Sequence, residues 1–133
     1  MKKPLVILLV EDNPHNLFLF STALRERGHQ VVEANTGEKA LLLGALHGPD
    51  LILLDIGLPG TSGMGVAAEI RAHPDMVDCP IIAVTAHRLD AQQAGREGID
   101  HVIQKPVLPK ELASEVERWW QDRDAAQAGG AAD

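Results

Sequence analysis

The sequence lacks features that define several classes of protein. Cys79 is its only cysteine, so no disulfide can form within the chain, and a reducing compartment, the cytoplasm, is expected. No apolar run approaches the roughly 20 residues of a membrane span, and the run at residues 5–10 is too short for a signal-peptide core. Acidic residues outnumber basic ones 19 to 12, and the resulting net charge of −7 argues against nucleic-acid binding.

The remaining composition is that of an ordinary globular protein. Hydrophobic residues make up 45% of the 133 residues and charged residues 23%, which suits one domain with a substantial core. We place this domain at residues 1–121. Residues 122–133 are rich in Ala and Gly and have no periodicity, which predicts a frayed helix end or a disordered tail.

Short apolar runs alternate with helical patterns along the chain. Strands are predicted at residues 5–10, 29–34, 51–54, 81–84 and 101–104. Helices are predicted to begin at Asn13-Pro14, at 35–37, at Ser62, at about Asp90 and at Pro109. Strand and helix therefore alternate five times, and this order implies an α/β fold in which a parallel sheet has helices on both faces.

Polar residues stand where the apolar strands end. Glu11 and Asp12 follow the first strand, Asp55 the third, Thr85 the fourth and Lys105 the fifth. Because ligands bind at the carboxyl ends of parallel strands, these side chains are expected to form one site. A carboxylate at the end of a buried strand is poorly hydrated and needs a reason to be there. We therefore predict that Asp55 is a nucleophile that accepts a phosphoryl group.

Each of these residues also has an ordinary explanation when it is considered alone. Glu11 and Asp12 would suit a solvated helix start, where acids favour the helix dipole. Thr85 would satisfy its own backbone, Lys105 would be a surface lysine before a turn, and Asp55 a loop residue. Their occurrence in order, each after its own apolar strand, favours a shared site.

This set of residues resembles the receiver domain of two-component response regulators. The resemblance covers about residues 4–121 and rests on Glu11-Asp12, Asp55 with Pro59-Gly60, Thr85-Ala86 and Lys105-Pro106. It implies a flavodoxin-like, five-stranded parallel sheet with strand order 2-1-3-4-5, which is the order known for that fold family.

The three carboxylates point to a divalent cation. Like charges packed together are unfavourable unless a cation lies between them, and Mg²⁺ is the usual choice where phosphate is handled. By resemblance, Asp12 and Asp55 bind Mg²⁺ directly. The backbone carbonyl of Gly57 supplies a further ligand, and Glu11 acts through a bound water.

The resemblance also implies the reaction and its partners. A histidine kinase or histidine phosphotransfer protein donates the phosphoryl group to Asp55, and Thr85 and Lys105 neutralise charge on the phosphoryl oxygens. The expected output is contact with a downstream protein by a monomer or weak dimer. The chain is not expected to be a turnover enzyme, nor to bind nucleic acid or membrane.

The chain departs from the family at a switch position. Receivers often carry Tyr or Phe three residues before the lysine, where this sequence has Val102 and contains no Tyr. The conformational change is expected instead in residues 86–90 and the weak helix after them. His87, two residues after Thr85, is expected to alter the rate of dephosphorylation.

Two alternatives remain open at this point. A pseudo-receiver would bind partners without being phosphorylated. A flavodoxin-like cofactor-binding domain is disfavoured, because the chain has only two Phe and two Trp for stacking and no glycine-rich loop after its first strand.

Overall fold

The computed structural model describes residues 3–58 and 63–132, so the predicted helix start at Ser62 and the Pro59-Gly60 pair lie outside the described residues. Within these ranges the strands are β1 (Val6–Val10), β2 (Gln30–Ala34), β3 (Leu51–Asp55), β4 (Ile81–Thr85) and β5 (His101–Gln104). The helices are α1 (Pro14–Glu26), α2 (Gly37–His47), α3 (Gly63–Ala72), α4 (Ala91–Arg96) and α5 (Pro109–Ala132).

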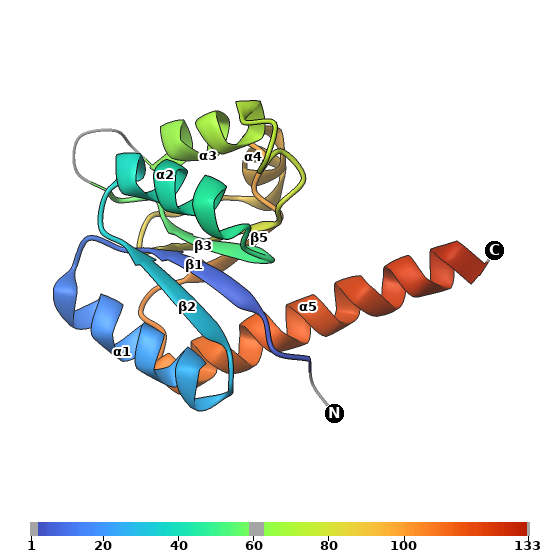
Figure 1. Ribbon diagram of the computed structural model, residues 1–133, viewed down its shortest axis with the longest axis horizontal. Coiled ribbons are helices and arrows are strands. Elements are labelled where there is room, and N and C mark those ends of the chain that lie inside the picture. The colour runs from blue at the N-terminus through green and yellow to red at the C-terminus, as the bar shows by residue number, and fades with distance from the viewer. Residues whose placement is uncertain (1–2, 59–62, 133) are drawn as a thin grey trace.

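The strands form one parallel sheet in the order β2-β1-β3-β4-β5. Helices cover both faces of this sheet (Figure 1). The predicted fold class and the strand order implied by the resemblance are therefore confirmed. Because β1, β3 and β4 are central and parallel, their carboxyl ends meet at one edge of the sheet.

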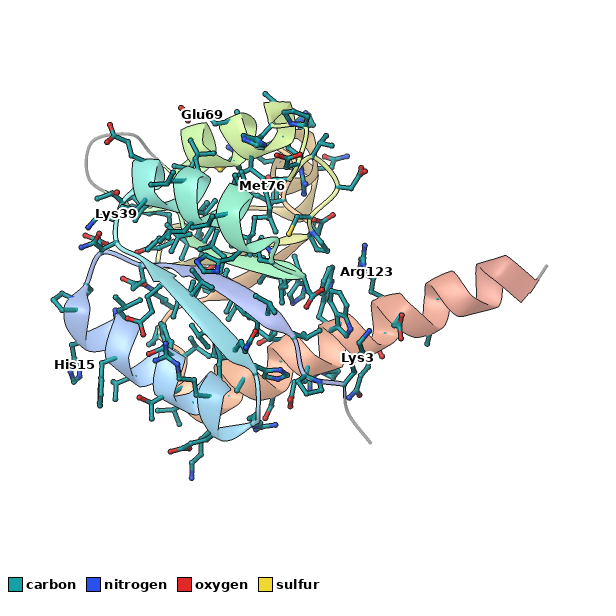
Figure 2. All side chains as sticks on the ribbon, viewed as in Figure 1. Lys3, His15, Lys39, Glu69, Met76 and Arg123 are labelled. Carbon is teal, nitrogen blue, oxygen red and sulfur yellow. The ribbon has the colours of Figure 1, made fainter. Side chains whose placement is uncertain are left out.

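The core has two layers, one on each face of the sheet. Successive side chains of a strand point to opposite faces, so Leu8 packs with α2 and α3 whereas Leu9 packs with α1 and α5. Met76, labelled beside α2 in Figure 2, places its sulfur in the space that a side chain on Gly44 would need. Burial of each large aliphatic side chain stabilises the fold by roughly 1.5–3 kcal/mol.

Local capping explains where two of the helices begin. The Asn13 side chain accepts a hydrogen bond of 3.0 Å from the Asn16 N–H, and Pro14 occupies the first helical position. Asp90 accepts a hydrogen bond of 2.7 Å from the Gln93 N–H at the start of α4. A cap of this kind is typically worth about 1 kcal/mol. Both starts were predicted from the sequence.

Helix α5 is longer than predicted. It continues to Ala132 and projects beyond the sheet (Figure 1), whereas a frayed end or disordered tail was predicted from residue 122. Alanine has the highest helix propensity, and the Arg123 guanidinium lies 5.9 Å and 5.3 Å from the ring centres of Trp119 and Trp120. Although α5 has 24 residues, no helix in the described ranges is long and apolar enough to cross a membrane.

Candidate functional site

Three carboxylates converge at the carboxyl edge of the sheet. Glu11 and Asp12 directly follow β1, and Asp55 is the last residue of the neighbouring strand β3. One oxygen from each carboxylate lies within 4.8 Å of the others. The sheet thus brings together acids that are more than forty positions apart in the sequence.

Lys105 extends into this acidic cluster from the end of β5. Its Nζ lies 3.1 Å from Glu11 Oε2 and 3.4 Å from Asp55 Oδ2. The side chains of Glu11 and Asp55 are 2% and 10% exposed, so the ammonium offsets part of their lost hydration. Burial raises the pKa of the Glu11 carboxyl and Asp55 raises it further, whereas Lys105 opposes this shift.

The charges of the cluster fit a divalent cation. Counted as formal charges, three carboxylates and one ammonium give an excess of two negative charges. All of the acidic ligand atoms are oxygens, which Mg²⁺ prefers. Glu11, Asp12 and Asp55 therefore form a chemically suitable donor set for Mg²⁺.

Gly57 lies beside both the Asp55 carboxylate and the His87 imidazole. The Gly57 N–H donates a hydrogen bond of 2.9 Å to Asp55 Oδ1. A Cβ on Gly57 would lie 3.5 Å from Asp55 Oδ1 and 3.5 Å from His87 Nε2. The absent side chain therefore leaves an open space between the carboxylate and the imidazole.

Thr85 connects the end of β4 to two neighbouring segments. Its side chain is buried, and its Oγ1 accepts a hydrogen bond of 3.0 Å from the backbone N–H of His87. Its carbonyl oxygen accepts hydrogen bonds from the Lys105 N–H at 2.8 Å and from Gln104 Nε2 at 2.9 Å. A change in the position of Thr85 would therefore reach both the loop after β4 and the end of β5.

Val102 lies away from the acidic cluster. It pairs with Ala83 in the sheet and packs in the core layer shared with α2, α3 and α4. With Leu89 and Ala94 among its neighbours, it lines a hollow of about 390 Å³ between α4 and β5. The proposed switch position thus borders α4 rather than Asp55.

Gly63 supports the site and was not singled out from the sequence. Its N–H donates a hydrogen bond of 3.0 Å to the Ile56 carbonyl. A Cβ on Gly63 would overlap with the Cα of Ile56 and with the Asp55 carbonyl oxygen. The start of α3 therefore rests on the backbone that carries Asp55, and only glycine allows this contact. The available signal was the Gly63-Met64-Gly65 sequence, since glycine is a poor helix former.

Comparison with known sequences identifies the family. The profile of the response regulator receiver domain matches residues 7–117. The chain belongs to the response regulator receiver domain family. The polar-differentiation response regulator DivK of Brucella anthropi is 35% identical over 106 residues, which cover 78% of this chain and 86% of DivK. The chain is accordingly a receiver domain of two-component signalling.

Solved receiver structures agree with this assignment. The receiver domain of the sensor histidine kinase PA1611 from Pseudomonas aeruginosa PAO1 is 34% identical, with a TM-score of 0.77 over 88% of this chain and 98% of that chain. That receiver holds a magnesium ion in its active site cleft. The chemotaxis regulator CheY4 of Vibrio cholerae, 23% identical with a TM-score of 0.80 over 87% of this chain and 98% of its own, shows the same fold.

The properties of the receiver family bear on this site. They are signalling proteins that bind Mg²⁺ at an acidic site and interact with histidine kinases or phosphotransfer proteins. The oxygen donors gathered here are consistent with such a site.

Proposed function

We propose that Asp55 accepts a phosphoryl group from a phosphohistidine of a histidine kinase or phosphotransfer protein. The observation that carries this proposal is the environment of Asp55. Its carboxylate is almost fully buried, has two further carboxylates nearby and lies 3.4 Å from the Lys105 ammonium. A carboxylate that lies in a shielded pocket beside an ammonium is a suitable nucleophile.

The acidic residues of the pocket would hold the metal. Glu11, Asp12 and Asp55 supply carboxylate oxygens, with Glu11 acting through water, and Gly57 supplies its backbone carbonyl. When bound, Mg²⁺ would neutralise charge on the phosphoryl oxygens and on the crowded carboxylates. The excess of two negative charges supports this assignment.

The remaining residues position and neutralise the transferred group. An Asp55 oxygen forms a bond to phosphorus as the phosphorus–nitrogen bond of the donor breaks, and the electron pair of that bond returns to the imidazole. Lys105 neutralises one phosphoryl oxygen, and the Thr85 hydroxyl donates a hydrogen bond to another. Positioning and electrostatic stabilisation supply most of the rate in such transfers.

The phosphorylated domain would then act by binding a downstream protein, as a monomer or weak dimer. Because Val102 replaces the switch aromatic, the change would be carried by residues 86–90 and α4. The hydrogen bond between Thr85 and the His87 N–H supports this route. His87 would also alter the rate at which water removes the phosphoryl group. A cytoplasmic location suits a donor of this kind.

Intact mass after incubation with Mg²⁺ and a small acyl-phosphate donor tests the proposal. The wild type should gain the mass of one phosphoryl group, and Asp55→Asn should gain none. Asp75→Asn, which changes an exposed aspartate elsewhere, should behave like the wild type. A wild-type chain that stays unmodified would contradict the proposal and would instead indicate a receiver that only binds partners.

A further inference from the structure

The outer edge of β2 exposes part of its backbone. Strand β2 stands first in the order β2-β1-β3-β4-β5, and among residues 3–58 and 63–132 the one strand that pairs with it is β1. Figure 1 shows β2 at the outside of the sheet, with α1 and α2 on either side of it. An edge strand of this kind presents backbone N–H and C=O groups that can pair with a strand of another chain.

The hydrogen bonds at the start of β2 identify which of its groups point outward. The Gln30 N–H donates to the Leu5 carbonyl at 2.9 Å, so the backbone groups of Gln30 face the β1 side. The N–H and C=O of one residue point to the same side of a strand, and this side alternates from each residue to the next. Val31 and Glu33 therefore direct their backbone groups away from the sheet.

Arg25 lies across this exposed edge. It belongs to the last turn of α1, and its Nη2 donates to the Val31 carbonyl at 3.1 Å while its Nη1 lies 2.8 Å from Glu33 Oε2. One guanidinium thus occupies an outward acceptor of the edge and holds the side chain of the other outward residue. The side chains of Arg25 and Glu33 are 49% and 36% exposed, and an exposed ion pair contributes little to stability. Its position suits protection of the edge, for which proteins often use charged side chains.

The exposed edge is complementary to itself. Its outward residues, Val31 and Glu33, lie symmetrically about Val32. An antiparallel second copy, related by a two-fold axis at Val32, would place Val31 of each copy opposite Glu33 of the other. The two residues of such a pair exchange both of their N–H···O bonds. Because each Glu33 faces a valine, this register puts no two like charges directly opposite each other, which would be unfavourable.

We propose that the outer edge of β2 is a pairing surface for a second copy of this chain and that Arg25 closes this surface in the monomer. The pairing joins two five-stranded sheets into one continuous sheet. It stops at two copies, because both use the same edge around one two-fold axis. The inference does not depend on phosphorylation of Asp55, so it stands or falls separately from the proposed function.

Light scattering coupled to size-exclusion chromatography compares the wild type with Arg25→Ala over a range of protein concentrations. The variant should form dimers with a dissociation constant at least about tenfold below that of the wild type, the factor expected when a carbonyl is released from a charged donor. Arg96→Ala is the matched control, because it removes an exposed arginine on α4 and makes the same change in net charge. This control should behave like the wild type.

A proline at the edge should reverse the effect. Glu33→Pro, added to Arg25→Ala, removes an outward N–H and places the proline ring on the pairing surface, whereas the ladder to β1 keeps its bonds. Glu33 is exposed, so this change removes no core packing. The double variant should be monomeric. If Arg25→Ala does not fold, Glu33→Ala removes the carboxylate that holds Arg25 and should give dimers to a smaller degree.

A disulfide tests the register of the pairing. Opposed residues of a non-hydrogen-bonded antiparallel pair have Cα atoms about 4.5 Å apart, which is within the range of a disulfide. Val32→Cys, combined with Arg25→Ala and with Cys79→Ser to remove the native thiol, should cross-link two copies under mild oxidation. Gln30→Cys in the same background should stay unlinked, because the two-fold axis places Gln30 opposite Ala34.

Three results would overturn the pairing surface. Arg25→Ala might associate no more than the wild type, in which case Arg25 closes nothing. Dimers that persist after Glu33→Pro is added would show that the contact lies elsewhere on the chain. Assemblies larger than a dimer, or cross-linking of Gln30→Cys in place of Val32→Cys, would exclude the two-fold arrangement.

Discussion

The Lys105 ammonium nitrogen lies 3.4 Å from Asp55 Oδ2, although the two residues are 50 positions apart in the sequence. The ammonium also contacts the buried Glu11 carboxylate. It therefore provides the positive charge that two poorly hydrated acids need. This relationship couples the stability of the fold to the chemistry proposed for the site.

Replacing Lys105 with alanine should destabilise the domain unless metal is present. The change leaves Glu11 and Asp55 without their cation, and breaking a buried ion pair costs about 3–5 kcal/mol. Because Lys105 is partly exposed, we expect a loss of about 2–3 kcal/mol in the free energy of unfolding without metal. Mg²⁺ should restore part of this loss. Urea unfolding in chelator and in Mg²⁺ measures both values.

Lys110→Ala, at an exposed position, is the control for the Lys105 variant. A loss of stability in Lys105→Ala that Mg²⁺ does not change would contradict the prediction.

Removing one carboxylate should weaken metal binding. Asp12→Ala removes an oxygen donor of the cluster, so we expect the dissociation constant for Mg²⁺ to rise at least about tenfold. Glu69→Ala is a matched control, because Glu69 lies exposed on the outer side of α3, away from the cluster (Figure 2). Calorimetric titration of the three proteins gives the constants. Equal affinities for wild type and Asp12→Ala would show that Asp12 is not a ligand.

The Cys79 thiol should make stability fall at alkaline pH. Burial raises its pKa from 9.0 to about 11, so the unfolded chain ionises first as pH rises. The thiol therefore adds no pH dependence to stability below about pH 9, and the free energy of unfolding decreases between pH 9 and 11. The difference between wild type and Cys79→Ser in urea unfolding at pH 8 and pH 10 isolates this slope from other titrating groups. An unchanged difference between the two pH values would refute the expectation.

Two glycine-to-alanine changes should have opposite effects. Gly63→Ala forces a Cβ into the backbone of Asp55 and Ile56, and we expect it to cost roughly 2–3 kcal/mol. Gly95→Ala adds a Cβ where no atom lies within 4 Å, so a gain of up to about 1 kcal/mol is expected from helix propensity. Chemical unfolding of both variants compares them directly. A stabilised Gly63→Ala would contradict the packing described for α3.

Local patterns predicted most of the elements and the positions of the candidate site residues. The apolar run before Asp55 became a strand that is buried throughout, because hydrophobic residues continuous over four positions suit a parallel strand covered on both faces. Asn13 and Asp90 cap their helices because each side-chain oxygen accepts a hydrogen bond from a backbone N–H of the first turn. Helix α5 continues past residue 122 to Ala132, where the sequence has no periodicity but is rich in alanine, the residue with the highest helix propensity.

Contacts between residues that are far apart in the sequence were known only from the tertiary structure. That Lys105 contacts Glu11 and Asp55 and that Arg71 anchors the end of α4 required the folded chain. None of these pairs leaves a local pattern, because their separation is set by how helices cross from one parallel strand to the next. Sequence patterns specify which residues end each strand, whereas the order of the strands in the sheet specifies which of those ends are neighbours.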